Sequence, residues 1–334
     1  MRELRAIEVP DVQARRPLST VSLTRVGVTG VEKVLRVRSD GDEQLYYAQL
    51  ECFVDLPPDQ KGAHMSRFEE VVNEAIDEVV LGEAFKAETL AAHIAERVRE
   101  RQRGLRAEAR IAARYPISRP APASGVPTQE IYTMFGVAVA SERGTRRIVG
   151  VQAQGMTACP CAQELVLDRA LRRLEQAGIA AQEAAAVLRE VPVATHNQRG
   201  IGTLHIGSTE DCAAGVEATD LLAIVESSMS SEIYELMKRP DEALVVERAH
   251  RTPRFVEDCV REMVRQAVER YGHLGDGSFI HARQENLETI HRHNVVAERS
   301  GLLGELRREL AGGGHVLHHV TMREWLEARE TLPQ

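Results

Sequence analysis

The sequence has 334 residues, with 42 Lys and Arg against 50 Asp and Glu, which gives a formal net charge of −8. That balance excludes a broad basic surface for nucleic acid. A chain of this length buries enough apolar surface to fold without disulfides. No segment is long and apolar enough for a membrane helix or a secretory leader, so we expect a cytoplasmic protein that binds neither nucleic acid nor membranes.

Cysteine use points to chemistry at one place in the chain. Five cysteines in a reducing compartment do not form a disulfide framework, and metal binding or catalysis is the leading use for any that cluster. Two of the five do cluster, in the sequence Cys159-Pro160-Cys161.

Apolar spacing predicts strands and helices in both halves of the chain. The first half contains a charged arm at 1–20, alternation from 21 to 55 with a strand at 45–54, helices at 66–80 and 87–103, and strands at 105–113 and 130–140. Proline and glycine residues between the last two strands predict a long irregular loop. The first helix is preceded by a capping-box pattern, Ser66 followed by Glu69.

The second half repeats this order. It contains a strand at 148–153, a long Ala-rich helix at 162–189, a strand at 202–206, helices at 217–237 and 253–271, and a strand at 277–284. Strands on both sides of a helix pair favour an α+β fold in which helices cover one face of an antiparallel sheet. The tail after 297 is expected to add a helix, a glycine break and a last amphipathic segment.

The cysteine pair stands in the sequence GMTACPCAQ at 155–163, between a predicted strand and a predicted helix. A helix N-terminus favours an anionic thiolate, and a thiolate is a good ligand for zinc or iron(II). Two buried apolar cysteines would give the same spacing, so both interpretations stay open. A structural zinc finger is disfavoured because no second pair of Cys or His follows at finger spacing.

Three further polar clusters lie at the ends of predicted elements: THNQRG at 195–200, LMKRPDE at 236–242 and ENLETIHRH at 285–293. Each alone fits a solvated loop or a charged helix end. Together with the cysteines they supply Cys, His and Glu side chains, and three protein ligands with one open position are typical of a catalytic zinc site. Such a metal lowers the pKa of a bound water to about 7 and supplies hydroxide at neutral pH.

These four clusters, together with QKGAHMSRF at 60–68, resemble the type IB GTP cyclohydrolase I family over residues 10–296. The resemblance implies tandem tunnelling-fold modules, each an antiparallel sheet with a helix pair on one face. It also implies a homotetramer with active sites at subunit interfaces. On this basis we expect an N-terminal arm at 1–20, a first module at 21–142, a second module with the metal site at 143–296 and a C-terminal extension at 297–334.

The family's site residues fall, by this resemblance, mostly in the second half. The implied metal ligands are Cys159, His196 and Glu242, which would hold one Zn²⁺, Mn²⁺ or Fe²⁺ per subunit. The implied catalytic residues are Cys159, His291 as a proton-transferring histidine, and Glu257, whose carboxylate would pair with N1–H and the amine of guanine.

Other residues receive less defined roles. Cys161 is expected to be a supporting or structural residue. Six basic side chains offer donors for a triphosphate, and which of them holds which phosphate stays open. These are Lys61, His64, Arg67, Arg199, Lys238 and Arg239.

The implied reaction is hydrolytic opening of the imidazole ring of GTP by water. Formate leaves, and the product is 7,8-dihydroneopterin triphosphate, in the first step of tetrahydrofolate and pterin biosynthesis. The motifs GMTxCPCAQ and ATHNQRG are closer to those of the archaeal branch. In this respect the chain is similar to iron(II)-dependent enzymes that form 7,8-dihydroneopterin 2′,3′-cyclic phosphate. That product is the alternative.

Two departures and two rival functions remain. Shorter family members have fewer residues between the positions of Cys159 and His196, and the C-terminal tail extends past the resemblance. A tunnelling-fold reductase with a nucleophilic cysteine and a nicotinamide cofactor is one rival function. A non-catalytic pterin-binding module that has kept the fold is the other.

Overall fold

The computed structural model describes residues 11–39, 42–79, 86–212, 215–314 and 316–327. The chain divides into two compact units. Unit 1 holds the described residues of Met1–Ala113 and Gly136–Arg147, and unit 2 holds those of Arg114–Phe135 and Ile148–Gln334. The first ten residues of the expected arm lie outside the described residues, and 11–20 form only turns and bends. The module boundaries expected from the sequence stay a prediction.

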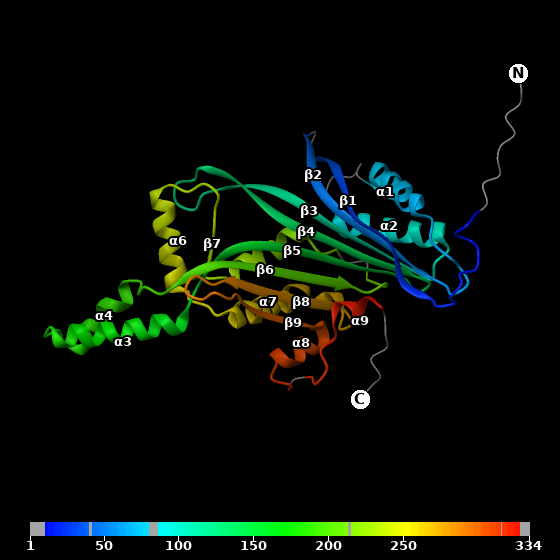
Figure 1. Cartoon of the computed structure of the whole chain (residues 1–334). Coiled ribbons are helices and arrows are strands. Elements are labelled where there is room, and N and C mark those ends of the chain that lie inside the picture. Colours follow the sequence, from blue (N-terminus) through cyan, green and yellow to red (C-terminus); the bar gives the residue numbers. More distant parts are fainter. Residues whose placement is uncertain (1–10, 40–41, 80–85, 213–214, 315, 328–334) are drawn as a thin grey trace, which may run out of the picture. The chain divides into compact units, whose positions relative to one another are not determined.

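Unit 1 combines antiparallel strands with a pair of helices (Figure 1). Its elements are β1 (Leu23–Ser39), β2 (Asp42–Leu56), α1 (Met65–Val79), α2 (Ala87–Gln102), the first part of β3 (Arg106–Pro120), the end of β4 (Pro127–Ser141) and the start of β5 (Gly144–Ala158). Strand β2 pairs antiparallel with both β1 and β3. Alternate β2 side chains from Ala48 to Leu56 are buried, and so are Leu90, Ile94 and Val98 of α2. Helix α1 begins at Met65, so Ser66 lies inside the helix and is not its N-cap.

Unit 2 holds most of the remaining elements. They are the rest of β3, the first part of β4 (Pro127–Ser141), most of β5 (Gly144–Ala158), α3 (Pro160–Gln176), α4 (Ala181–Glu190), β6 (Asn197–Ser208), α5 (Ala218–Ser227), β7 (Ser231–Glu232), α6 (Arg239–Arg251), α7 (Val256–Tyr271), a 3₁₀ turn (Gly272–Leu274), β8 (Phe279–Leu287), β9 (Val295–Leu302), α8 (Leu303–Leu310) and α9 (Met322–Leu326). The strands are ordered β3-β4-β5-β6-β8-β9, and β7 pairs with β5. The β6–β8 and β8–β9 pairs are antiparallel.

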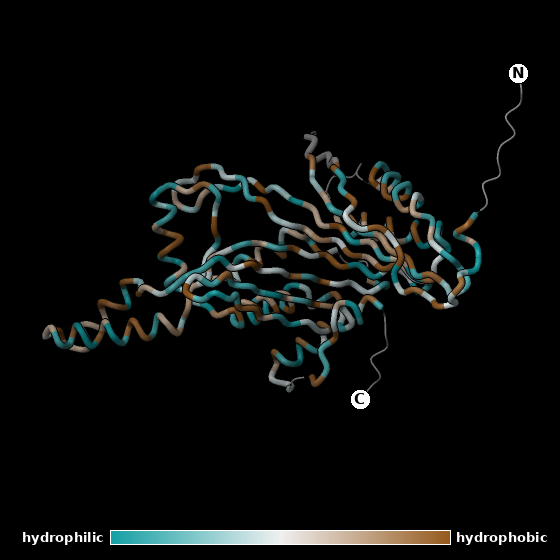
Figure 2. The backbone as a smooth tube through the Cα atoms, in the orientation of Figure 1, coloured by the Kyte–Doolittle hydropathy of each residue, from teal (hydrophilic) through white to brown (hydrophobic). Residues whose placement is uncertain are grey.

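The core of unit 2 lies between its strands and the helix pair α5 and α7. Leu204 and Ile280 come from neighbouring strands, while Leu221 and Met263 come from the two helices; all four are fully buried. Figure 2 shows apolar positions interleaved with polar ones along these elements, as expected for half-buried strands and helices. Burying each such side chain contributes about 1.5–3 kcal/mol. The expected α+β class, with antiparallel strands and a helix pair, is confirmed.

The helix expected at 162–189 is in fact two helices, α3 and α4. The chain turns at Gly178, whose φ is +88°. The N–H groups of Gly178 and Ile179 donate to the carbonyls of Glu175 and Leu174 at 2.9 and 3.0 Å, which ends α3. Glycine adopts this left-handed conformation without steric cost. The Ala-rich sequence on both sides conceals the break.

The helix expected at 217–237 ends at Ser227. The hydroxyls of Ser227 and Ser228 donate to the carbonyl of Ile224 at 3.2 and 2.7 Å. Such side-chain bonds compete with the backbone bonds that would continue the helix. The chain then forms β7, with Glu232 opposite Gly155 of β5.

The irregular loop expected after residue 113 is mostly strand. Strand β3 continues to Pro120 and β4 begins at Pro127, which leaves only 121–126 as the turn. Ala121 donates to the carbonyl of Val126 at 2.9 Å, and Gly125 takes a φ of +69°. Both prolines stand at strand ends, where a missing N–H is tolerated.

The C-terminal segment packs on unit 2. Strand β9 extends the sheet beside β8, which the sequence did not predict. Trp325 of α9 is 3% exposed, stacks on Phe279 and donates its indole N–H to the carbonyl of Gly277 at 2.9 Å. The described part of the tail therefore covers the end of the core. Within the described residues, no helix has the length and apolar character needed to cross a membrane.

Asp241, in the first turn of α6, ties this helix to the β3–β4 turn. The residue is fully buried. One carboxylate oxygen accepts from the N–H groups of Ala123 and Ser124 at 2.7 and 2.8 Å. The other accepts from the Ser124 hydroxyl at 2.6 Å and the Lys238 N–H at 2.7 Å. Burial opposes ionisation, but these hydrogen bonds outweigh it and hold the pKa of Asp241 well below its usual range.

We predict that Asp241 makes the stability of the protein depend on pH in the acid range. The folded-state pKa lies below the value of about 3.9 expected in the unfolded chain. The contribution is therefore complete above that unfolded value and is lost as pH falls toward the folded one. Asp241→Asn should be less stable than the wild type at pH 7, and the difference should shrink below pH about 4. Urea unfolding across this range measures it, with the exposed Asp168→Asn as control. A difference that stays constant with pH would contradict the prediction.

Candidate functional site

A cavity of about 250 Å³ opens within unit 2 where β5 and β8 end and where β6, α3 and α7 begin. Four residues singled out in the sequence line it: Cys159, His196, Glu257 and His291. They come from four segments that are far apart along the chain.

Cys159 is the N-cap of α3, directly before Pro160 at the first helical position. Its sulfur accepts a hydrogen bond from the N–H of Ala162 at 3.5 Å. Its backbone is tied to the segment before β6, because its N–H donates to the carbonyl of His196 at 3.1 Å and its carbonyl accepts from the Thr195 hydroxyl at 2.8 Å. Cysteine and histidine are therefore held together although a helical hairpin separates them in sequence.

His196 is largely buried, with 14% of its side chain exposed. Its Nδ1 lies 3.1 Å from Oε1 of Gln198 and 3.7 Å from Oε2 of Glu288. Its ring meets that of His291 edge to face at 6.4 Å between centroids. His291 in turn stacks on His293 at 5.2 Å. The wall of the cavity thus carries three imidazole rings, each in contact with the next: His196, His291 and His293.

Glu257 lies in the first turn of α7 and is exposed at the cavity. The segment before it is fixed, since the N–H of Arg254 donates to the carbonyl of Ala158 at 3.0 Å and its guanidinium donates to that of Ser227 at 2.9 Å. The N–H of Phe255 donates to the carboxylate of Asp258 at 3.0 Å, which caps the helix. Glu257 is therefore presented from a rigid helix start beside Cys159.

Several expected residues do not line this cavity. Glu242, Lys238 and Arg239 are exposed at the start of α6, and Arg199 is exposed on β6. Cys161 is exposed in the first turn of α3. Their site roles stay predictions.

Three expected residues belong to unit 1. His64 is held by Gln102, whose side chain bonds both its N–H and its carbonyl at 3.2 and 2.8 Å. The N–H of Lys61 donates to the carbonyls of Gln13 and Arg15 at 3.1 and 2.9 Å. Arg67 donates to the carbonyl of Arg101 at 3.1 Å. The segment at 60–68, which runs into the start of α1, is thus well anchored within its own unit.

Eight further residues that received no role from the sequence line the cavity, and five of them are polar: Gln198, Arg254, Asn286, Glu288 and His293. Four of the five stand inside the motifs at 195–200 and 285–293, whereas Arg254 lies outside the motifs, three residues before Glu257. What the motifs did not convey is which of their polar side chains face inward. Only pairing of the strands determines that direction.

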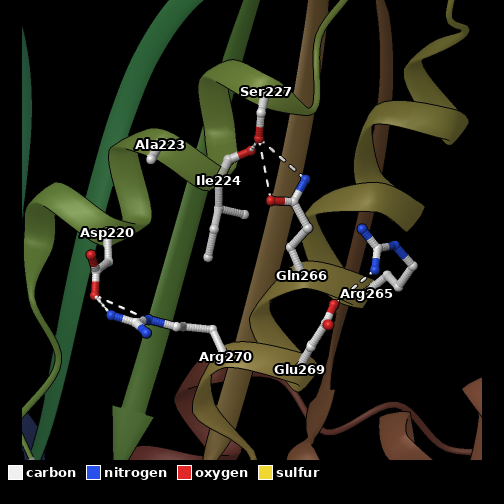
Figure 3. A pocket seen from close by; sticks show the side chains of 8 residues that line it. All are labelled: Asp220, Ala223, Ile224, Ser227, Arg265, Gln266, Glu269 and Arg270. Carbon is white, nitrogen blue, oxygen red and sulfur yellow. Dashed lines mark hydrogen bonds and ion pairs between the residues drawn. The ribbon is translucent and has the colours of Figure 1, made fainter.

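A larger hollow of about 660 Å³ lies between α5 and α7 (Figure 3). Its charged side chains pair with one another: Arg270 with Asp220 at 2.7 Å, and Arg265 with Glu269 at 2.9 Å. None of the residues expected to do chemistry lines it. Size alone therefore does not make it the candidate site.

The donor set around Cys159 partly fits a divalent metal. A thiol and an imidazole share one cavity, and Oε2 of Glu288 is buried there without a hydrogen bond. Thiolate, imidazole and carboxylate are the ligand types that zinc and iron(II) accept. Within the part of the chain that the structure describes, however, no three His, Cys, Asp or Glu side chains are gathered closely enough to hold a metal. The chemistry of the side chains that line the cavity thus suits such a metal, but their spacing does not complete a site.

Comparison with known proteins gives the family. The family model described as "Type I GTP cyclohydrolase folE2" matches residues 9–297. The chain is 42% identical over 315 residues to GTP cyclohydrolase MptA of Methanococcoides burtonii, covering 92% of this chain and 99% of that protein. It is 41% identical over 308 residues to GTP cyclohydrolase MptA of Methanocaldococcus jannaschii, covering 90% and 97%.

Among solved structures, a uricase from Arthrobacter globiformis is similar with a TM-score of 0.48 at 8% identity, covering 83% of this chain and 92% of that one. The sequence matches are far stronger. They include the five motifs and every residue that lines the cavity. The chain belongs to the type I GTP cyclohydrolase folE2 family.

Proposed function

We propose that this protein is a metal-dependent enzyme of the type IB class that opens the imidazole ring of GTP and releases formate. The observation that carries the proposal is the cavity that gathers Cys159, His196, Glu257 and His291. Family membership makes GTP and water the proposed substrates. The residues at the cavity supply the three functions that this reaction needs: metal ligation, recognition of the base and proton transfer.

The product we propose is 7,8-dihydroneopterin 2′,3′-cyclic phosphate. The linear triphosphate is the main product expected from the sequence, and the cyclic phosphate is the alternative. Relatives named GTP cyclohydrolase MptA, at 40–42% identity and nearly full length, support the alternative. The cyclic phosphate is the product that the similarity to the archaeal branch implies. A cyclic monophosphate keeps one phosphorus of GTP, so the other two must leave.

A divalent cation held by Cys159 and His196 would supply activation of a water for attack at C8 of the purine. The carboxylate of Glu257 would accept hydrogen bonds from N1–H and the exocyclic amine of guanine, which orients the base. His291, which lines the cavity, would donate a proton as the C8–N9 bond breaks. A second hydrolysis then releases formate.

The third metal ligand and the phosphate donors are proposed to come from outside the cavity. A volume of about 250 Å³ is below the usual range of about 300–1,000 Å³ for small-molecule sites, so one chain encloses only part of GTP. We therefore keep the proposal of a homotetramer with sites completed at subunit interfaces. Glu242 would then be the third ligand, and the phosphates would bind some of the basic residues expected from the sequence: Lys61, His64, Arg67, Arg199, Lys238 and Arg239.

We predict that anaerobically purified protein with Fe²⁺, Mn²⁺ or Zn²⁺ converts GTP to one equivalent of formate and a pterin with a single phosphate. Mass spectrometry of the product, with a separate formate assay, measures both. A pterin carrying three phosphates would overturn the cyclic product but leave ring opening intact. Absence of formate with all three metals would overturn the proposed reaction. NADPH-dependent turnover of a purine-derived nitrile would favour the reductase.

Cys159→Ala should lose both metal and activity. Loss of a residue that only orients a metal ligand typically lowers metal affinity or activity 10–100-fold. Loss of a ligand itself should lower them further, so we expect less than about 1% of wild-type formate release. Metal content by elemental analysis should fall in parallel. Cys212→Ala, at a cysteine outside the cavity, should keep both. Full activity of Cys159→Ala, or of chelated wild type, would contradict metal dependence.

Glu257→Gln should lose discrimination between GTP and inosine triphosphate, which lacks the exocyclic amine. A hydrogen bond to a charged group contributes about 1.5–3 kcal/mol, so the wild type should prefer GTP by roughly 10–100-fold in kcat/KM. The variant should approach equal use of the two. Glu269→Gln, on an exposed turn of the same helix, should keep the wild-type preference. An unchanged preference in Glu257→Gln would remove this residue from base recognition.

A further inference from the structure

Glu288 carries a buried carboxylate whose environment the proposed reaction does not explain. Only 6% of its side chain is exposed, and its Oε2 accepts no hydrogen bond from the described residues. Nδ1 of His196 lies 3.7 Å from this oxygen. A buried carboxylate oxygen without a hydrogen bond is costly, so a fold that keeps one there has a further interaction for it to make.

A second acceptor faces the same imidazole nitrogen. Oε1 of Gln198 lies 3.1 Å from Nδ1 of His196. The Gln198 side chain is itself fixed, because its Nε2 donates to the hydroxyl of Thr157 at 3.1 Å in the buried interior. Thr157 belongs to β5 and Gln198 to β6, so this bond fixes the amide between neighbouring strands.

These contacts determine where the imidazole proton lies. An amide could face a ring nitrogen with either its oxygen or its nitrogen, but an ionised carboxylate can only accept. Oε1 of Gln198 lies within hydrogen-bond distance of Nδ1 of His196, and the Glu288 carboxylate lies beyond that distance but close by; both favour the tautomer in which Nδ1 carries the hydrogen. The lone pair is then on Nε2, which is the nitrogen left to bind a metal.

We propose that Glu288 is a positioning residue that holds His196 in the Nδ1–H tautomer, with Nε2 free as the metal ligand. This inference rests on the proposed metal-dependent function and adds a residue to it. A cation held at Nε2 would make the Nδ1–H group more positive and would so strengthen its attraction to the nearby carboxylate. Carboxylate partners of this kind orient ligand histidines and raise their basicity, and their loss typically lowers metal affinity 10–100-fold.

The test compares metal binding in wild type, Glu288→Gln and the control Glu298→Gln, whose residue is 62% exposed on β9. Metal-free proteins are titrated with Zn²⁺ against a chromogenic chelator. Glu288→Gln keeps the shape and one acceptor but loses the charge, so its Kd for Zn²⁺ should rise about 10–100-fold. The control should match the wild type within twofold.

Two further measurements separate positioning from other roles. Thermal unfolding of the metal-free proteins should show Glu288→Gln no less stable than wild type, because a buried unpaired charge has been removed. With Co²⁺ in place of Zn²⁺, its d–d absorption bands should keep the wild-type positions and intensities, because the first coordination sphere is unchanged.

Each contrary result has a distinct meaning. A Zn²⁺ affinity of Glu288→Gln equal to wild type would overturn the proposal and leave the proposed function standing. Altered Co²⁺ bands would overturn it by making Glu288 a direct ligand. A metal-free variant that is less stable by as much as its metal binding is weakened would assign Glu288 a purely structural role. A wild type that binds no Zn²⁺ or Co²⁺ would overturn both this inference and the metal-dependent function.

Discussion

The antiparallel pairing of β6 with β8 determines where the candidate site forms. In this register Arg199 lies opposite Leu287, and each step back along β6 is matched by a step forward along β8. His196, just before β6, and Glu288, just after β8, must therefore meet at one edge of the sheet. A slip of one residue would turn the inward side chains to the other face, and the buried pair Leu204 and Ala282 makes that slip unfavourable.

The same constraint explains how the chain accommodates the α3–α4 hairpin inside its site. The hairpin leaves after Cys159 and returns at Thr195, and two hydrogen bonds close its base. Closing a longer connection adds only about 0.6 kcal/mol for each doubling of its length. No residue of α3 is buried, so the hairpin adds little to the core. The cysteine and the histidine stay together because the strands hold them, and the length of the connection has little influence.

Periodicity predicts those parts of the fold in which one face is buried. The apolar spacing of α7 and the alternation of β2 appear as expected, because tertiary packing and local pattern agree there. Prediction fails where a local polar bond or a distant strand decides. Ser228 ends a helix although apolar residues at helical spacing continue to Met237, and Pro120 lies in a strand because its partner β4 turns back so tightly. The motifs identify Cys159, but strand pairing alone reveals the role of its neighbours.

The two adjacent carboxylates of the KRPDE motif, Asp241 and Glu242, have different surroundings: Asp241 is buried and Glu242 is exposed. Each carboxylate oxygen of Asp241 accepts two hydrogen bonds, which come from the β3–β4 turn and from the start of its own helix. The first turn of α6 therefore cannot rotate to carry Glu242 toward Cys159 without breaking these bonds. Glu242 is left exposed on a rigid support. A residue held in this way is suited to contribute to a site on a neighbouring subunit. Subunit assembly is the event proposed to complete the metal site.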